Sequence, residues 1–260
     1  MSEPARLGIV TTGTGPRPEY EEFHSRLLAD LGLPDVEVVA RHALDGLGDA
    51  EIDALAPRDD MAAIHTYVHS DDPGDRSWIG SGRREVWIDR SHFIDLAQGC
   101  MRKLGDAGVD AGILCIAEEM PGYAFSTSFP MVFPQLAMLN LVEMIARADR
   151  NTRVVSFVYG DRQREQQMAA WQRDPWMEGV TVMPVDLRQG WASAAEEASR
   201  FRPDLGLVWG YGSGLINAGD GGLEALRGGL GAPVHTAHTV ATIAARNLLP
   251  PPIDPGRYVG

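Results

Sequence analysis

A cysteine at the end of an apolar run is the residue of this chain whose type and position most favour chemistry. The run Ala111–Ile116 predicts a β-strand with Cys115 near its end, and the loop after it carries Glu118, Glu119 and Tyr123. Because ligands bind at the carboxyl ends of strands in an open α/β sheet, this thiol is a candidate proton donor or nucleophile. Cysteine is also among the most buried residue types, so an inert core thiol is the alternative.

Charged side chains elsewhere in the chain could support such a thiol. Glu118 could act as an acid or base if a cleft desolvates its carboxyl group and raises its pKa. A carboxylate this close would also raise the pKa of the thiol, which disfavours a resting thiolate. Arg17 could bind a substrate carboxylate through two parallel hydrogen bonds, and its alternative role is an ion pair with a loop carboxylate such as Asp45.

The residue spacing does not support a metal or cofactor site. His65 and His69, which with His92 could suggest a metal site, lie four residues apart on a predicted strand. Such side chains are about 13 Å apart along the strand, too far for one ion unless the strand bends. Cys100 and Cys115 form no CxxC pair. The glycine pair near the N-terminus is followed by proline and arginine, which excludes a dinucleotide-binding fingerprint. We therefore expect no cofactor and no metal.

Composition and charge limit the classes of partner. The chain has 260 residues, of which 44% are hydrophobic and 23% charged, as in a soluble protein with one large domain or two lobes. Its net charge of −13 disfavours nucleic acid and anionic membranes as partners. No apolar run reaches a membrane-spanning length, and the N-terminus lacks the pattern of a secretion signal. We expect a small-molecule ligand and a cytoplasmic location.

Strand and helix patterns alternate through the first half of the chain. Apolar and β-branched runs or helical spacing predict strands at Leu7–Thr12, Val36–Ala40 and Ala111–Ile116, and helices at Glu19–Leu31, Asp49–Leu55 and Phe93–Leu104. Asp49 is the expected N-cap of the second helix. Residues Ala62–Val68 and Glu85–Ile88 predict a hairpin, because no helical pattern lies between them. This hairpin could be a lid or a dimer arm.

The second half repeats this rhythm. Strands are predicted at Val154–Tyr159, Val180–Val185 and Leu205–Trp209, and helices at Phe133–Ala148, Arg162–Gln172, Ala192–Phe201, Leu223–Leu230 and Thr239–Leu249. An internal echo supports the repeat, since one strand follows Asp110 and ends at Cys115, while another follows Asp204 and ends at Trp209. This alternation predicts an α/β fold with a small-molecule cleft between two halves.

Several of these segments resemble the AroM-like family of the aspartate/glutamate/hydantoin racemase superfamily. Thr11–Pro18 is similar to the family's Thr-x-Gly-x-x-Pro-Arg-Pro signature. Leu114-Cys115-Ile-Ala-Glu118 resembles its Leu-Cys-Thr-Gly-Glu strand end. Further similarity covers Ala43–Leu47, Glu51-Ile52, Leu55-Ala-Pro57, Pro134-Gln135, Glu165–Gln167 and Trp171.

The resemblance implies two pseudo-symmetric α/β lobes, each a mostly parallel sheet flanked by helices, with the active-site cleft between them. We assign residues 1–119 and 235–260 to the first lobe and residues 120–234 to the second. The resemblance also implies cofactor-independent chemistry at a carbon next to a carboxylate or carbonyl, with one cysteine from each lobe flanking that carbon. Relatives with this architecture commonly pair, so a homodimer is compatible with it.

The chain departs from the two-cysteine arrangement. The position of the second cysteine falls at Trp209 or Gly210, and neither residue can move a proton. Ile116 replaces the hydroxyl residue expected after the first cysteine. Cys100 lies on a predicted helix, where packing is its expected role. A racemase that uses two cysteine bases is therefore disfavoured.

The resemblance also indicates which groups surround a single thiol. The superfamily stabilises developing negative charge with amides and hydroxyls at strand ends, and the candidates here are Thr11, Thr12, Gly13, Thr14, Tyr211, Gly212 and Ser213. Each could also be only a turn residue. Arg17 and Tyr123 complete the predicted substrate-binding set. His235 is the expected proton-transfer partner, because the superfamily chain returns to the cleft there, and a helix-start histidine bonded to backbone is the alternative.

Three functions remain open. A single-cysteine enzyme would use Cys115 as proton donor or nucleophile on a small carboxylate or cyclic imide, in decarboxylase, isomerase or related lyase chemistry. A racemase or epimerase could instead combine Cys115 with a second base that is not cysteine. A non-catalytic small-molecule sensor could have kept the cleft, and Trp209 filling the site would favour it.

Overall fold

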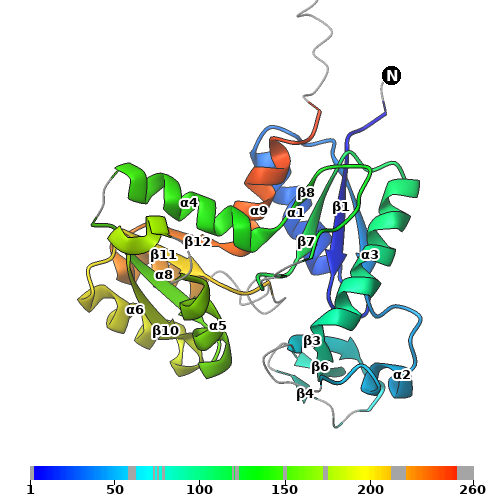
Figure 1. The fold of residues 1–260 in the computed structure, drawn as a ribbon, viewed down its shortest axis with the longest axis horizontal. Helices are drawn as coiled ribbons and strands as arrows, with labels where there is room; N and C mark the ends of the chain where they lie inside the picture. The colour runs from blue at the N-terminus through cyan, green and yellow to red at the C-terminus, as the bar shows by residue number, and fades with distance from the viewer. Residues whose placement is uncertain are drawn as a thin grey trace, which may run out of the picture.

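The fold consists of two parallel sheets flanked by helices and a separate hairpin (Figure 1). The computed structural model describes residues 3–57, 63–72, 74, 76–77, 80–118, 120, 123–148, 151–171, 175–211 and 221–250. This architecture confirms the predicted α/β class with two lobes. Within these ranges, every helix is too short or too polar to cross a membrane.

The first sheet has the strand order β2–β1–β7–β8, with all strands parallel. Its strands and connecting helices are β1 (Arg6–Thr11), α1 (Pro18–Asp30), β2 (Glu37–His42), α3 (Arg90–Asp106), β7 (Ala111–Cys115) and β8 (Met131–Val132). β7 is buried along its whole length, as expected for a central strand covered by helices on both faces. Because Thr11 pairs with Cys115, the two central strands end side by side.

The second sheet repeats this order as β10–β9–β11–β12, again parallel throughout. Its elements are β9 (Arg153–Val158), α5 (Asp161–Trp171), η2 (Pro175–Gly179), β10 (Thr181–Asp186), η3 (Leu187–Gln189), α6 (Trp191–Arg200), β11 (Leu205–Val208), α8 (Gly221–Leu230) and β12 (Val234–Thr236). The sequence echo has a structural cause. Asp110 accepts a hydrogen bond from the Arg6 backbone N–H, and Asp204 accepts one from the Arg153 N–H, both at 2.8 Å. Each aspartate thus ties its own strand to the start of the neighbouring strand.

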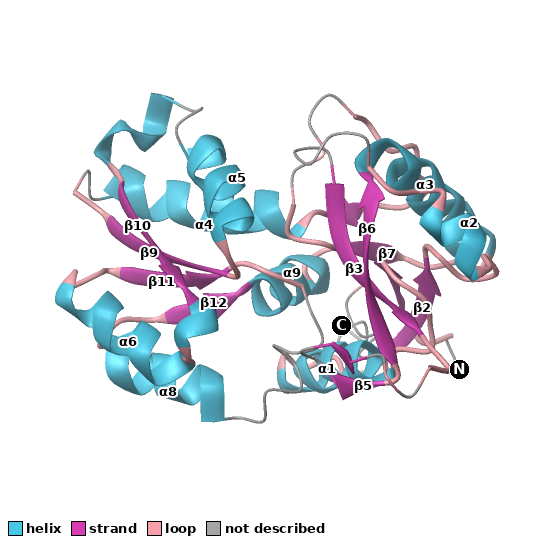
Figure 2. Ribbon diagram, turned by 90° about the horizontal axis from the view of Figure 1, so that it is seen from below, coloured by secondary structure: helices cyan, strands magenta, loops and turns pink. Residues whose placement is uncertain are grey.

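Two helices cross between the lobes. α4 (Pro134–Ala148) follows β8 of the first sheet and lies over the second sheet in Figure 1. α9 (Ala237–Arg246) follows β12 of the second sheet, packs against α1 and β7, and lies between the two sheets in Figure 2. One hydrophobic core therefore includes Leu7 and Cys115 of the first lobe and Val154 and Trp209 of the second. A large shared apolar core of this kind disfavours independent motion of the lobes.

An antiparallel hairpin adjoins the first lobe. β3 (Ala63–His69) pairs with β6 (Arg83–Asp89), which confirms the predicted hairpin, and β4 (Arg76–Ser77) pairs with β5 (Gly80–Ser81). The short helix α2 (Asp49–Asp53) is attached to it, because Arg84 pairs with Asp49 and Asp53 at 3.1 and 2.8 Å. The prediction that Asp49 is the N-cap is wrong, since Gly48 holds that position and Glu51 accepts its N–H at 2.8 Å.

Two short strands carry no sequence signal. β8 has two residues and β12 three, which is too few for a recognisable alternation of polar and apolar positions. The predicted lobe boundary between residues 234 and 235 falls inside β12, which pairs with β11 in the second sheet. The division into residues 1–119 plus 235–260 and residues 120–234 otherwise stays a prediction.

Candidate functional site

Groups from both lobes meet around Cys115 at the end of β7. Tyr211 follows β11 of the second sheet, and its side chain interacts with the Cys115 thiol. The ring of Tyr211 stacks on Tyr20 of α1 with 6.0 Å between ring centroids, and the Tyr20 hydroxyl donates to the Tyr211 carbonyl. The carboxyl ends of a strand from each sheet thus converge on the thiol, as in many α/β ligand sites.

The Cys115 side chain is buried, with 2% of its surface exposed. Burial raises the pKa of the thiol well above its usual value, and a hydrogen bond with the Tyr211 hydroxyl opposes this effect only in part. The sulfur also lies 3.8 Å from the Ile113 carbonyl oxygen. Cys115 is therefore a neutral thiol at neutral pH, which can donate a proton but is not a resting thiolate nucleophile.

A chain of buried polar groups leads away from the thiol. Tyr211 Oη lies 3.1 Å from His24 Nε2, and His24 Nδ1 lies 2.8 Å from Thr242 Oγ1. Thr242 Oγ1 in turn donates to the His238 carbonyl at 2.8 Å. Burial lowers the pKa of His24 to about 3, so its imidazole is neutral. The chain thus links α1, α9 and the loop after β11 through uncharged groups.

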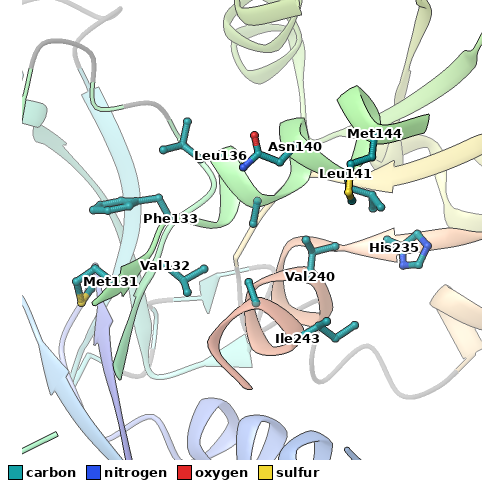
Figure 3. Close-up of a pocket in the computed structure, with 12 residues that line it drawn as sticks. Met131, Val132, Phe133, Leu136, Asn140, Leu141, Met144, His235, Val240 and Ile243 are labelled. Atoms are coloured by element: carbon teal, nitrogen blue, oxygen red, sulfur yellow. The ribbon is translucent and has the colours of Figure 1, made fainter. Parts of the chain in front are cut away.

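The histidines near this chain are His24 and His238. The His238 ring packs against Tyr211 with 4.0 Å between centroids, and burial lowers its pKa well below the usual value. His235, the predicted proton-transfer partner, lies in β12 and lines a groove between α4 and α9 (Figure 3). The geometry therefore brings His24 and His238, rather than His235, to the residue that contacts Cys115.

The loop after β1 is held by its own hydroxyl groups. These contacts join Thr11 Oγ1 to His42 Nδ1, Thr12 Oγ1 to Thr66 Oγ1, and Thr14 Oγ1 to the His69 N–H, at 2.8, 2.7 and 2.8 Å respectively. Gly13 lies so close to the Tyr67 carbonyl that a Cβ atom at this position would collide with it. The predicted substrate-binding loop is thus fastened to β2 and to the hairpin.

Arg17 is buried between this loop and the hairpin, with 3% of its surface exposed. Its guanidinium donates to the Thr14 carbonyl at 2.9 Å and to the Tyr67 carbonyl at 2.5 Å. Asp45, the alternative partner considered from the sequence, instead accepts the Gly15 N–H at 2.8 Å. Both acceptors of Arg17 are neutral carbonyls. Burial lowers the pKa of the guanidinium, and the negative charge of Glu19 opposes this effect in part.

Glu118 belongs to a polar cluster between the loop after β7, the hairpin and α5. Burial raises the pKa of Glu118 to about 7, although Arg90 and Arg162 lower it in part. Its Oε2 atom is buried and has no hydrogen-bond partner within the described ranges. Arg162 lies over the Trp87 ring, 4.5 Å from its centroid, and donates to the Ala63 carbonyl at 3.4 Å. The predicted acid–base residue therefore titrates near neutral pH, next to a contact between the hairpin and the second lobe.

Two tyrosines beside this region, one buried and one half-buried, are not among the site residues predicted from the sequence. Tyr67 lies on β3 and Tyr159 follows β9, and burial raises the pKa of both. The charge of Arg17 and the side chain of Tyr159 both act on Tyr67, so the three groups lie near one another. Aromatic residues on or next to strands are usually core residues, so the sequence holds no signal that separates these two.

Three remaining predicted residues lie elsewhere or cannot be placed. Tyr123 is 37% exposed and packs against Phe125 with 4.6 Å between ring centroids. Gly212 and Ser213 fall outside the described residues, as does Glu119.

An apolar groove of about 420 Å³ lies between α4 and α9 (Figure 3). Its walls include Leu136 and Met144 of α4 and Val240 and Ile243 of α9, with His235 at one end. Cys115 does not line it, so this groove is distinct from the thiol site.

Comparisons with known proteins give a family and a shared fold. A family model described as AroM protein matches residues 7–205. The structure of allantoin racemase from Klebsiella pneumoniae has 12% sequence identity and a TM-score of 0.55, over 94% of this chain and 87% of that chain. The structure of an aspartate racemase homologue from Pyrococcus horikoshii OT3 has 13% identity and a TM-score of 0.48, over 94% and 98%. No curated protein matches the sequence.

Proposed function

Because this chain belongs to the AroM protein family and shares its fold with a racemase, we propose that it is a cofactor-independent enzyme acting on a small carboxylate or cyclic imide. In this proposal Cys115 donates a proton to a planar carbanion next to a carboxylate or carbonyl group. The observation that carries it is the buried, neutral thiol beside the Tyr211 hydroxyl, where the lobes meet.

The protonation state of the thiol favours one of the reactions open to a single cysteine. Isomerisation by addition and hydrolysis both need a thiolate nucleophile, and racemisation needs a base on one face of the carbon. A thiol whose pKa is raised by burial keeps its proton at neutral pH. Decarboxylation suits this state best, because the departing carbon dioxide leaves its electron pair on the substrate and the thiol supplies only the proton.

The second lobe has no cysteine that could act on the opposite face of a substrate, since Cys100 and Cys115 both precede it. Trp209 is fully buried and packs edge-on against Trp171, with 5.8 Å between ring centroids. Gly210 has no side chain. Protonation from Cys115 alone gives one configuration at a new stereocentre, so the product should be a single enantiomer.

Arg17 and Glu118 complete the proposed site. The Arg17 guanidinium binds a substrate carboxylate, and the loop Thr11–Thr14 stabilises developing negative charge. Glu118 acts as an acid or base, since a pKa of about 7 leaves both of its protonation states populated at neutral pH.

A non-catalytic small-molecule-binding protein is the second candidate. With 2% of Cys115 exposed, a ligand in this conformation has no direct access to the sulfur. Such a protein would still use Arg17 and Glu118 to hold a ligand.

Ligand screening followed by matched cysteine variants separates the two candidates. A library of small carboxylates and cyclic imides is screened for thermal stabilisation, where a ligand at 100 times its Kd adds about 2.7 kcal/mol to the free energy of unfolding. Each ligand is then tested for turnover with the wild type, Cys115→Ala and Cys100→Ala, the last being a control because Cys100 is also buried, in a different core cluster. An enzyme of the proposed kind loses turnover only in Cys115→Ala. Unchanged turnover in that variant ends the proposal, and binding without turnover by the wild type supports the second candidate.

A further inference from the structure

The hydrogen bonds between Thr242 and His24 have a fixed direction, because a hydroxyl carries one hydrogen. Thr242 Oγ1 donates that hydrogen to the His238 carbonyl, 2.8 Å away and one turn earlier in α9. The contact of 2.8 Å between Thr242 Oγ1 and His24 Nδ1 therefore uses the hydrogen of Nδ1. A neutral imidazole has one ring hydrogen, so His24 Nε2 presents a lone pair.

This lone pair sets the direction of the Tyr211 hydroxyl. Tyr211 Oη lies 3.1 Å from His24 Nε2, so the phenol hydrogen points to His24. Towards Cys115 the hydroxyl then has only lone pairs. The thiol donates its own hydrogen to the Ile113 carbonyl oxygen, 3.8 Å away. In the resting protein neither hydrogen therefore lies between the sulfur and the oxygen of the Tyr211 hydroxyl.

The neighbouring groups hold Tyr211 in this place. Its carbonyl accepts a hydrogen bond from the Tyr20 hydroxyl, and its ring packs between Tyr20 and His238, with centroid distances of 6.0 and 4.0 Å. Tyr211 itself is 6% exposed and His24 is fully buried. Water is therefore kept from competing for the hydroxyl, and rotation of its hydrogen is the remaining freedom.

We propose that the Tyr211 hydroxyl is a two-position hydrogen-bond switch, which points to His24 while Cys115 carries its proton and turns to the sulfur when that proton leaves. The proposal rests on the proposed function, in which the S–H bond breaks, the hydrogen forms the new C–H bond, and the electron pair stays on sulfur. The turn is a rotation about the Cζ–Oη bond and transfers no proton. His24 and Thr242 are positioning residues, because they act through Tyr211.

The switch favours the state that follows proton transfer over the state before it. A neutral thiol receives no hydrogen bond from Tyr211, whereas the thiolate receives one, and a bond to an ionised acceptor is about twice as strong as a neutral one. An interaction that strengthens as charge develops lowers the barrier, while one that is equal in both states does not. The hydrogen bond from Tyr211 thus offsets part of the cost of holding a thiolate in a buried site, and it does so only once the proton has left the sulfur.

The ring nitrogens of His24 test the first position in the resting protein without any substrate. In ¹⁵N NMR of histidine-labelled protein, His24 should show the Nδ1–H tautomer from pH 8 down to pH 5, since burial lowers its pKa to about 3. The variant His24→Phe identifies its signals. Thr242→Val removes the acceptor of Nδ1 and should move the hydrogen to Nε2, whereas Thr239→Val on the same helix should not. An Nε2–H tautomer in the wild type overturns the switch.

Alkylation of the thiol tests the second position. In a Cys100→Ala background, the rate of Cys115 with iodoacetamide at pH 9 is compared between the parent, Tyr211→Phe and Thr242→Val. Tyr211→Phe removes the donor to the thiolate and should lower the rate about tenfold, as expected for a lost hydrogen bond to a charged group. Thr242→Val should raise the rate by a similar factor, because Nε2–H turns the Tyr211 hydroxyl to the sulfur.

The opposite signs of these two changes distinguish the switch from a purely structural effect. Loosened packing would expose the thiol and raise both rates, so a rise in both variants, or a response in neither, overturns the proposal. Failure of the proposed function appears separately, as unchanged turnover in Cys115→Ala, and does not alter the NMR or alkylation results.

Discussion

Replacing Glu118 with glutamine should stabilise the protein above neutral pH. Burial raises the pKa of Glu118 in the folded protein from the ordinary 4.5 to about 7. Between these two pH values the unfolded chain loses this proton while the folded chain keeps it. The unfolded state then binds fewer protons, so the free energy of unfolding falls as pH rises. Below about pH 4.5 both states are protonated and above about pH 7 both are ionised, so the effect is confined to this window.

The size of the effect follows from the width of the window. A span of about 2.5 pH units corresponds to about 3 kcal/mol, because one pH unit is worth about 1.4 kcal/mol. The neutral amide of Glu118→Gln has no such titration. Its advantage over the wild type should therefore grow from near zero at pH 4.5 to about 3 kcal/mol at pH 8, equivalent to a rise in Tm of roughly 6–12 °C for a chain of this size.

Urea unfolding at five pH values from 4.5 to 8.5 measures this difference directly. Glu196→Gln is the matched control, because Glu196 is exposed and pairs with Arg200 on the surface of α6 at 2.6 Å. Its difference from the wild type should stay within about 0.5 kcal/mol at every pH. The reasoning about Glu118 is refuted if its difference does not change with pH, or if Glu118→Gln is less stable than the wild type at pH 8. Either result would mean that the folded protein stabilises the ionised Glu118 carboxylate with hydrogen bonds or charges as well as water does.

Three further predictions concern packing. Gly13→Ala should lower the free energy of unfolding by about 2 kcal/mol or more, because the new Cβ meets the Tyr67 carbonyl. Gly228→Ala on α8 has open space around the new Cβ and should raise the free energy of unfolding by about 0.4–1 kcal/mol. Similar urea midpoints for the two variants would contradict this. Trp209→Ala should cost about 3–5 kcal/mol in the same assay, since this fully buried ring packs against Trp171, and a loss below 1 kcal/mol would show that it is not a core residue. Arg162→Met should speed hydrogen exchange of the β3 and β6 amides several-fold and leave exchange in β1 unchanged, because the guanidinium over Trp87 holds the hairpin against the second lobe. Equal exchange of the β3 and β6 amides in the variant and the wild type would show that Arg162 does not hold the hairpin there.

Much of the fold is readable from local pattern. Short apolar runs alternate with segments of helical spacing, and this alternation predicts parallel sheets. Successive side chains of a strand point to opposite faces of the sheet, whereas side chains of a helix return to the same face every three to four residues. The repeat of Asp110 before β7 and Asp204 before β11 is visible in the sequence because each aspartate makes the same backbone contact in its own sheet. The predicted N-cap of α2 is wrong by one residue, because the Glu51 carboxylate accepts the N–H of Gly48 and helical structure therefore begins at Asp49.

The site is less readable, because its members come from distant segments. His24 and Tyr211 are 187 residues apart, and His24 and Thr242 are 218 apart. On α1, His24 follows Phe23 in an ordinary amphipathic pattern, so no local signal separates it from a core histidine. His235 and His238 are separated by the start of α9, which directs the first to the outer groove and the second to Tyr211.

The sequence by itself determined the class of fold, the family and the place of one thiol at the end of a central strand. These depend on periodicity and on contiguous motifs such as Thr11–Pro18 and Leu114–Glu118, which are local properties of the chain. Only the tertiary structure decided the state of that thiol. Burial in a core shared by both lobes raises the pKa of Cys115, and the thiol donates its hydrogen to the Ile113 carbonyl of its own strand. Desolvation depends on every atom packed around a group, so it cannot be read from the residues next to it in sequence.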